Sequence, residues 1–550
     1  MHFPELFETL LKGRGITKER AKDFLNPDYG KLHDPLLLPD MEKARDRVIR
    51  AIQDGEHIVV FSDYDADGIP GAVVLADFFL RAKYENVSFY IPHRHDEGFG
   101  LNLEAIDKIA RQTADGQSAR LIITVDCGIT DILEVASANE KGIDVIITDH
   151  HEPKAELPEA LAIVNPKRTD SVYPFKELCG SAVVFKLVQA ILAKESFGIK
   201  SGMEKWSLDM VAIATLSDMV PLVEENRILA RFGLEVLRKS PRPGLAALFR
   251  RLNLDQKNLN EDDIAFMITP RINAASRMGV PEDAFNLLKT TDQIEAERLA
   301  LHLEKINNER KGVVASVVKE AKSRLMKREK IGEVIVIGDP EWRPALAGLV
   351  ANSLVEEYSR PVFVWGRDGD GMLKGSCRSY NGYDLCILME RAGTAFVEFG
   401  GHAGAGGFSV TLENLTMLEE KLSRALDGVK AAEPPLGGET AKWLSIGLED
   451  IGENLWSMIS QFAPFGTGNE KPIFKISNVP IKNVRQFGKA GEHLELTLSN
   501  GIKAISFFSS PETYKLKNLQ TFVTLSAHLE KSYFRNRPEL RLRIVDIIKS

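Results

Sequence analysis

The chain has 550 residues, of which 44% are hydrophobic and 27% are charged. This globular composition can supply several hydrophobic cores, and at about 150 residues per domain the length predicts three or four domains. No stretch of the sequence approaches the roughly 20 apolar residues of a membrane span, and the N-terminus lacks a basic segment followed by an apolar core, so we expect a cytoplasmic protein without a membrane partner. The four scattered cysteines form no CxxC pair and therefore indicate neither a disulfide framework nor a zinc knuckle.

The formal net charge of -8 disfavours a nucleic-acid partner when it is averaged over the whole chain. Residues 531–543 (KSYFRNRPELRLR) depart from that average, because Tyr533 and Phe534 lie among five cations. Stacking rings beside phosphate-binding cations are typical of proteins that bind single-stranded nucleic acid. The basic run at residues 319–330 fits the solvated face of a helix instead.

Short β-rich segments alternate with helical stretches between residues 57 and 166. Their sequences are HIVVFS, VSFYIP, ARLIITVD, DVIITD and ALAIVNP. This alternation predicts βαβ units in a doubly wound parallel sheet, which is an α/β fold. Three of the strands run directly into acidic or histidine residues. Because open α/β sheets bind ligands outside the carboxyl ends of their strands, we expect these residues to meet in one crevice.

The remainder of the chain predicts further units. Apolar residues recur at helical spacing from about residue 292 to 330 and predict a long helix that connects two domains. A smaller α/β unit follows, and short strands near the C-terminus predict a β-barrel of the OB type. We expect an N-terminal helical segment (1–50), a parallel-sheet domain (51–230), a helical region with the connecting helix (231–331), a smaller α/β domain (332–430), a linker (431–442) and the barrel (443–550).

The run SDYDADG places Asp63, Asp65 and Asp67 at alternating positions after an apolar strand. Three carboxylates this close repel one another unless a cation or protons neutralise them. A solvated turn is the plainer interpretation of the run by itself. It does not account for the further acidic clusters at other strand ends.

Those clusters are TVDCG, which contains Asp126, and TDHHEP, which contains Asp149, His150 and His151. A set of carboxylates and imidazoles suits Mn²⁺ or Mg²⁺ better than structural zinc, which prefers thiolates. Asp218 ends an apolar helix; alone it would be interpreted as a helix-end residue, and it gains weight from the other acids. Two ions about 3.5 to 4 Å apart, bridged by a carboxylate, are a standard arrangement for phosphoester hydrolysis. The residues alone therefore predict metal-assisted phosphoryl chemistry.

The DHH triplet at residues 149–151, together with DYDADG, TVDCG and GGHAGAGG, resembles the DHH phosphoesterase superfamily with its DHHA1 domain. The segments LLKGRGITKERAKDFLNPDYGKLHDP, IPHRHDEGFGLN, TPRINAASRMG, LKGSCRS and APFGTGNEKPIF are, in this order, similar to the RecJ family of single-stranded-DNA exonucleases along nearly the full chain. The resemblance implies an enzyme that uses two Mn²⁺ or Mg²⁺ ions to release 5′ mononucleotides from single-stranded DNA in repair and recombination.

The resemblance also implies roles for individual residues. The metal ligands would be Asp63, Asp65, Asp67, Asp126, His150 and Asp218. Asp126 would bridge the ions, His151 would face the scissile phosphate, and Asp149 would orient a histidine. Contacts to the substrate would come from Arg271, Asn273, Arg277, Ser376, Arg378, Gly401 and His402. Without the resemblance, a structural ion pair is the plainer interpretation of Arg271, and a packed loop histidine that of His402.

Three sites depart from the family pattern. Relatives usually show a Trp-His-Gln-Gly type of segment where this chain has Trp-Arg-Pro-Ala at residues 342–345, so no role of that histidine carries over. Ser276 and Cys377 stand where glycine is common, which would narrow a nucleic-acid channel. None of the predicted metal ligands is altered, so we expect the activity to be retained.

Two alternatives stay open. A DHH phosphodiesterase acting on short oligonucleotides or cyclic dinucleotides, or a related pyrophosphatase, would lack the N-terminal segment and the barrel. A catalytically silent single-strand-binding relative would show eroded acidic motifs, and here they are whole. For the leading hypothesis we expect a monomer whose partners are single-stranded DNA and, in the cell, a helicase and a single-strand-binding protein.

Overall fold

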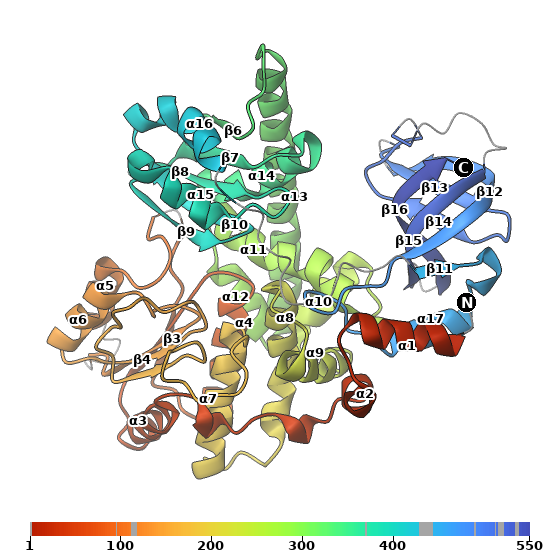
Figure 1. Cartoon of the computed structure of the whole chain (residues 1–550). Coiled ribbons are helices and arrows are strands. Elements are labelled where there is room, and N and C mark those ends of the chain that lie inside the picture. Colours follow the sequence, from red (N-terminus) through yellow and green to blue (C-terminus); the bar gives the residue numbers. More distant parts are fainter. Residues whose placement is uncertain are drawn as a thin grey trace.

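The computed structural model describes residues 3–94, 96–111, 118–368, 371–427, 429, 444–488, 491–511, 513–514, 522–533 and 538–549. The predicted linker therefore lies outside the described residues. The elements form a parallel-sheet unit, a helical region, a second sheet unit and a β-barrel (Figure 1). Within the described part of the chain, no helix is both long and apolar enough to cross a bilayer.

A five-stranded parallel sheet forms the first unit, and it confirms the predicted α/β fold class. Its strands, in the order β2-β1-β3-β4-β5 across the sheet, are β1 (Ile58–Ser62), β2 (Val87–Tyr90), β3 (Leu121–Val125), β4 (Asp144–Thr148) and β5 (Ala162–Val164). Both faces are covered by helices. These are α3 (Met41–Gln53), α4 (Gly68–Arg81), α5 (Leu103–Arg111), α6 (Ile132–Glu140) and α7 (Gly180–Lys194).

The alternation of side chains along β1 explains the two covered faces. Val60 packs in a core with residues of α3, α4 and α7, whereas Val59 and Phe61 pack in a core with residues of α5 and α6. β1 lies between β2 and β3. The chain therefore continues from β1 to β2 on one side of β1 and then crosses to β3 on the other side, so the order of the strands reverses at β1. The crevice outside the carboxyl ends of the strands at such a reversal is where open α/β sheets bind ligands.

Helices fill the region between the two sheets. They are α8 (Leu208–Ser217), α9 (Glu224–Leu237), α10 (Pro243–Leu252), α11 (Thr269–Met278), α12 (Glu282–Lys289) and α13 (Gln293–Met326). The 34-residue α13 confirms the predicted connecting helix, and it begins where the Asp292 side chain accepts a hydrogen bond from the backbone of Glu295. It packs against α10 and α11 near its start and against the second sheet unit near its end (Figure 1).

The second sheet unit is a mixed five-stranded sheet. Its strands, in the order β6-β7-β8-β10-β9, are β6 (Ile335–Gly338), β7 (Val362–Arg367), β8 (Leu373–Arg378), β9 (Glu398–His402) and β10 (Ala405–Val410). Its helices are α14 (Pro344–Tyr358), α15 (Leu385–Arg391) and α16 (Leu412–Leu426). The glycine-rich segment forms the hairpin β9–β10, where a Cβ on Gly401 would lie 2.4 Å from the Ala405 carbonyl oxygen.

The C-terminal strands close into a barrel, as predicted, because β15 pairs with both β16 and β12. The elements of this unit are β11 (Leu444–Ile446), α17 (Glu453–Ser460), β12 (Phe474–Phe487), β13 (His493–Leu498), β14 (Lys503–Ser506), β15 (Phe522–Ser532) and β16 (Glu539–Lys549). β16 includes part of the basic run. Leu542 and Ile544 enter the barrel core, while Arg541 and Arg543 lie on the other face of the strand.

The N-terminal helices belong to two different cores. Helix α1 (Phe3–Gly13) buries Leu6 and Leu10 in the core of the barrel, and the ring of Phe7 lies 5.2 Å from that of Phe462. Helix α2 (Lys18–Leu25) also packs there, whereas α3 belongs to the parallel-sheet unit. The two ends of the chain are therefore joined through the barrel (Figure 1).

Candidate metal centre

The loop between β1 and α4 carries three carboxylates, and two of them, Asp65 and Asp67, accept hydrogen bonds from backbone nitrogens. Both oxygens of Asp67 accept hydrogen bonds at the start of α7, from the backbone nitrogens of Gly180 (2.6 Å) and Ser181 (2.7 Å). A helix N-terminus favours negative charge, so this contact stabilises the Asp67 carboxylate. Asp65 accepts from the backbone nitrogens of Asp67 (2.7 Å) and Gly68 (3.1 Å).

Asp126 follows β3 in a backbone conformation that residues other than glycine seldom adopt. Its φ is 63°, and its nitrogen donates to the carbonyl of Thr148 at 2.9 Å. A Cβ on Gly180 would lie 2.6 Å from the Asp126 Cβ, so glycine at that position lets α7 approach the carboxylate. Left-handed backbone at such residues is retained where the surrounding structure enforces it, often at functional sites.

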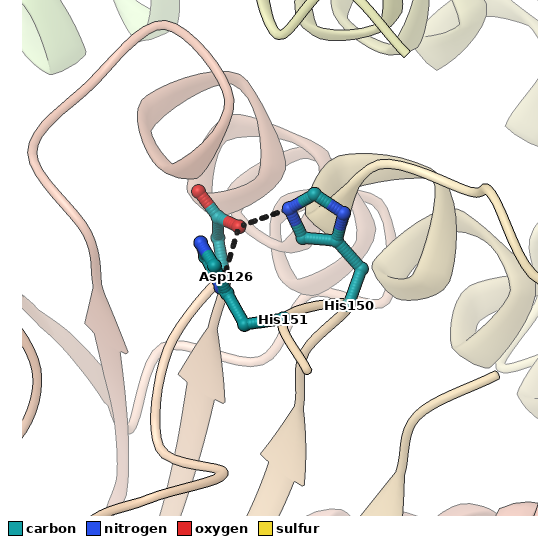
Figure 2. A group of neighbouring side chains, drawn as sticks. All are labelled: Asp126, His150 and His151. Atoms are coloured by element: carbon teal, nitrogen blue, oxygen red, sulfur yellow. Dashed lines mark ion pairs between the residues drawn. The ribbon is translucent and has the colours of Figure 1, made fainter. Parts of the chain in front are cut away.

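The two histidines that follow β4 converge on Asp126 (Figure 2). His150 Nε2 lies 3.2 Å from Asp126 Oδ1 and 3.7 Å from both Asp67 Oδ2 and Asp218 Oδ2. His151 Nδ1 lies 3.9 Å from the same oxygen of Asp126. Asp218 reaches this place from the end of α8. The structure thus brings the predicted acidic and histidine residues together at one edge of the sheet.

Asp149 is saturated by protein donors. Its Oδ1 accepts from the backbone nitrogens of His150 (2.7 Å) and His151 (3.1 Å) and pairs with His151 Nδ1 at 2.7 Å, while Oδ2 accepts from the Ile129 nitrogen at 3.0 Å. Burial alone would lower the pKa of His151, but Asp149 outweighs it and raises that pKa to about 9. The geometry favours a carboxylate that orients His151.

The remaining carboxylates are held in an environment that opposes their charge. Burial, followed by repulsion from neighbouring aspartates, raises the pKa values of Asp63, Asp126 and Asp218 well above the usual range. The same causes raise the pKa of Asp67 to about 6. Burial, and then His151, lower the pKa of His150 to about 3, so His150 is neutral at physiological pH.

These residues fit divalent cations. Among the described residues, the buried Oδ1 atoms of Asp63 and Asp126 have no hydrogen-bond partner, and buried oxygens of this kind are normally satisfied. Three sets of side chains each place their ligand atoms within 4.8 Å of one another, and Asp126 belongs to two of them. The sets are Asp63, Asp65 and Asp126; Asp67, His150 and Asp218; and Asp126, His150 and His151. Adjacent sites that share Asp126 suit a pair of ions.

Two of the residues predicted to bind substrate have partners within the protein. Arg271 is buried and pairs with Glu304 (Nε to Oε2, 2.8 Å), so the geometry favours the structural ion pair. Asn273 accepts a hydrogen bond from the backbone nitrogen of Ala66 at 2.9 Å and so holds the acidic loop.

Arg277 and Arg378 form a cationic cluster between the two sheet units. Arg277 donates to the Ala345 carbonyl oxygen at 2.7 Å, and burial, together with the cations Arg94, Arg310 and Arg378, lowers its pKa to about 9. Arg378 extends from β8 over Gly348, where a Cβ would lie 2.6 Å from Nη2. The other predicted contacts lie nearby on the same sheet: Ser376 is half-buried on β8, and Gly401 and His402 are exposed on β9.

Two residues of the loop between β2 and α5 were not predicted as site residues. The Arg94 guanidinium lies 5.1 Å from the ring centre of Tyr64 in the acidic loop. The Phe99 ring, 51% exposed, lies edge-on to the ring of His151 at 5.5 Å. The signal in the sequence was an arginine followed by an aromatic residue between two glycines, Gly98 and Gly100, both of which have positive φ.

The basic run near the C-terminus is partly paired within the protein. Lys531 pairs with Glu453 at 2.9 Å, and Arg541 pairs with Glu530 at 2.5 Å, so these cations already have protein partners. Phe534, Arg535 and Arg537 lie outside the described residues. Arg543 lies 5.6 Å from the ring centre of Phe266 and 5.5 Å from that of Phe507, which places a cation between two aromatic rings.

The structure also shows where the three departures from the family pattern lie. Ser276 and Cys377 are buried, with 1% and 0% exposure, so the expectation that they narrow a channel is wrong. Ser276 donates within its own helix to the Asn273 carbonyl oxygen, and the Cys377 sulfur packs 4.0 Å from that of Met389. Arg343 is exposed at the start of α14, with Nη1 3.9 Å from the Met278 sulfur.

Comparison with known proteins agrees with this architecture. The DHH family N-terminal domain matches residues 57–215, the DHHA1 domain matches 331–431, and the RecJ OB domain matches 444–546. The single-stranded-DNA-specific exonuclease RecJ of Haemophilus influenzae is 31% identical, and the match covers 99% of this chain and 96% of that protein. The chain belongs to the RecJ family.

Other relatives cover the chain to different extents. RecJ of Bacillus subtilis is 36% identical over 91% of this chain, which spans 62% of the length of that protein. Among solved structures, RecJ of Thermus thermophilus in complex with Mn²⁺ superposes with a TM-score of 0.80 at 27% identity, covering 99% of this chain and 76% of the other. The predicted domain types, a DHH unit, a DHHA1 unit and an OB barrel, are thereby confirmed.

Binding of Mn²⁺ to the metal-free protein should strengthen as the pH rises. The Asp67 carboxyl, with its pKa raised from 3.8 to about 6, must lose its proton before it can bind an ion. By the same shift, the native state in EDTA binds protons more tightly than the unfolded chain, so stability falls as the pH rises from 3.8 through about 6.

We therefore expect Mn²⁺ to raise the melting temperature more at about pH 7.5 than at about pH 5.5, as measured by differential scanning fluorimetry with an EDTA control. An equal increase at both pH values would contradict this expectation.

Proposed function

We propose that the protein is an exonuclease that degrades single-stranded DNA from 5′ to 3′ with two Mn²⁺ or Mg²⁺ ions and releases 5′ mononucleotides. The observation that carries the proposal is the buried Asp126, which forms one ligand set with Asp63 and Asp65 and lies 3.2 Å from His150 of the adjacent set at the carboxyl edge of the sheet. The relatives from Haemophilus influenzae and Bacillus subtilis are named single-stranded-DNA-specific exonucleases, and RecJ of Thermus thermophilus has been solved with Mn²⁺ and with Mg²⁺.

One ion would be held by Asp63, Asp65 and Asp126, and the other by Asp67, His150 and Asp218. Asp126 would be shared between them, because its Oδ1 lies 3.2 Å from His150 Nε2 of the second set. Bound ions would activate water and neutralise charge on the phosphoryl oxygens.

His151 would face the scissile phosphate. Its Nδ1 is engaged by Asp149 at 2.7 Å, and in the metal-free protein this pairing raises its pKa to about 9, so the ring there is protonated at neutral pH. Nε2–H can then donate to a phosphate oxygen, and the positive charge adds to the attraction. Asp149 fixes the direction of that donor.

The arginine cluster provides a reason for attack at the 5′ end. Arg277 and Arg378, together with Arg94 and Ser376, would hold a terminal phosphate, because the planar guanidinium matches phosphate oxygens. The loop that carries Arg94 also presents Phe99 beside His151, so the terminal nucleotide would lie between the cluster and the metals. Gly401 and His402 on β9 would contact the adjacent backbone. Asn273 would act indirectly by holding the acidic loop, and Arg271 by joining α11 to α13 through Glu304.

The barrel would hold the strand outside the active site. Arg543 with Phe266 and Phe507 combines a cation with rings that can stack on bases. A cytoplasmic monomer of this kind would take its substrate from a helicase or a single-strand-binding protein during repair and recombination. The barrel does not favour the alternative of a phosphodiesterase for short oligonucleotides, and the assembled acids do not favour a silent binding relative.

With Mn²⁺, the protein should digest single-stranded oligonucleotides and release label first from the 5′ end. Asp126→Asn should abolish turnover, because it removes the shared carboxylate charge. Gel analysis of 5′- and 3′-labelled single strands and blunt duplexes measures both effects, with circular dichroism to establish that the variant is folded. Preference for duplex, release from the 3′ end, or full activity of Asp126→Asn would each exclude the proposal.

Arg378→Ala should remove the preference for a 5′ phosphate. A hydrogen bond to a charged group is worth about 1.5–3 kcal/mol, so kcat/KM on a 5′-phosphorylated strand should fall about 10- to 100-fold, with little change on a 5′-hydroxyl strand. Arg367→Ala, at an exposed arginine at the end of β7, is the matched control. An equal loss on both substrates would mean that Arg378 does not recognise the terminal phosphate.

A further inference from the structure

The segment APFGTGNEKP at residues 463–472 has no part in the site described above, yet it docks close to a metal ligand. It precedes β12 and lies against the turn that joins α8 to α9, residues 218–224. Leu222 donates its backbone N–H to the Thr467 carbonyl oxygen at 2.7 Å. We call residues 462–471, which include most of this segment, the barrel loop. It contacts the chain at Leu222, four residues after Asp218.

The turn needs contacts from outside to keep its shape. Met219 and Glu224 have φ values of 60° and 44°, which residues other than glycine adopt only when the surroundings enforce it. Besides the bond from Leu222, the buried Asn226 donates from its side chain to the Pro221 carbonyl oxygen at 3.1 Å. The middle of the turn is therefore fixed by one contact from α9 and one from the barrel loop.

Arg227 anchors the barrel loop to α9. Its guanidinium is buried, with 2% of the residue exposed, and donates to the carbonyl oxygens of Phe24 (2.8 Å), Phe462 (2.9 Å) and Ala463 (3.1 Å). It also lies 3.7 Å from the ring centre of Phe24. One side chain therefore joins α9 to helix α2 and to the loop of the barrel.

The loop itself is built to fit this place. The buried Asn469 donates to the carbonyl oxygens of Phe462 (2.8 Å) and Pro464 (2.7 Å) and accepts from Arg14 Nε at 2.7 Å. A Cβ on Gly466 would lie 2.8 Å from a methyl carbon of Leu222, so this glycine permits close approach. Gly468, with φ 73°, lies against Pro221, where a Cβ would be 3.3 Å from that of the proline.

Asp218 is the candidate ligand that most needs such support. Asp63, Asp65 and Asp67 follow β1, Asp126 follows β3, and His150 follows β4, so the backbone of the sheet fixes the start of each of those segments. Asp218 instead ends a helix and continues into the docked turn. A carboxylate at a helix C-terminus also faces an unfavourable dipole, so other contacts must hold it in place.

We propose that the barrel loop 462–471, docked on Leu222 and Arg227, is a positioning device that holds the Asp218 carboxylate in the metal site. The inference rests on the proposed function, since it takes Asp218 to be a metal ligand. Arg227 acts through Asp218 and touches neither metal nor substrate. Loosening the joint weakens the site made by Asp67, His150 and Asp218 and spares the site made by Asp63, Asp65 and Asp126.

Calorimetric titration of the metal-free full-length protein with Mn²⁺ tests this directly. In Arg227→Ala, one of the two sites should lose affinity by about 10- to 100-fold, the range typical of residues that orient metal ligands, while the other is unchanged. Turnover on single-stranded DNA should require correspondingly more Mn²⁺ and recover at saturation. Arg360→Ala is the matched control, because Arg360 also donates to backbone carbonyls, those of Tyr358 and Ile331, but in the second sheet unit.

Gly468→Ala provides a second variant, since a side chain at φ 73° against Pro221 strains the joint without removing a buried charge. If Arg227→Ala does not fold, the same Mn²⁺ titration of Gly468→Ala tests the proposal. Unchanged affinity at both sites in a folded variant, or equal loss at both, overturns the proposal. Because the titration contains no DNA, a wild-type protein that binds Mn²⁺ without cutting DNA would contradict the proposed function and leave the test of the joint intact.

Discussion

Mutual repulsion among carboxylates buried at one edge of the parallel sheet is the constraint on which this structure depends. Asp63, Asp126 and Asp218 have raised pKa values because burial and neighbouring aspartates oppose their charge. The fold relieves part of this repulsion by placing the N-terminus of α7 against Asp67. The remainder requires cations, which explains why the buried oxygens of Asp63 and Asp126 lack protein donors within the described residues.

The other units can be understood through what they add to this edge. The second sheet unit contributes Arg378, which together with Arg94 forms the positive surroundings of Arg277, and Arg277 donates to the Ala345 carbonyl oxygen of that unit. The barrel contributes a loop that meets the turn after Asp218, and α1 and α2 tie that barrel to the N-terminus. Arg227 is buried because it joins these segments. Its guanidinium donates hydrogen bonds to carbonyl oxygens of α2 and of the barrel loop.

The sequence was most informative where structure is local. Strand patterns predicted the sheet, and because each acidic motif directly follows a strand, its place at the carboxyl edge could be inferred. Contacts between residues that are distant in the sequence could not be inferred. The partner of Arg271 is Glu304, on a different helix, so its ion pair has no local signature. Likewise, β16 was not predicted, because its outward arginines were interpreted as part of a basic run that binds nucleic acid. The arginine and the glycines around Phe99 mark an unusual loop, but they do not indicate that its ring meets His151.

The two-ion centre requires that both divalent ions contact Asp126. Anomalous diffraction at the manganese edge, from crystals soaked in Mn²⁺, locates such ions without any assumption about activity. We expect two peaks about 3.5 to 4 Å apart with the Asp126 carboxylate between them. A single peak, or two peaks that do not both contact Asp126, would contradict it.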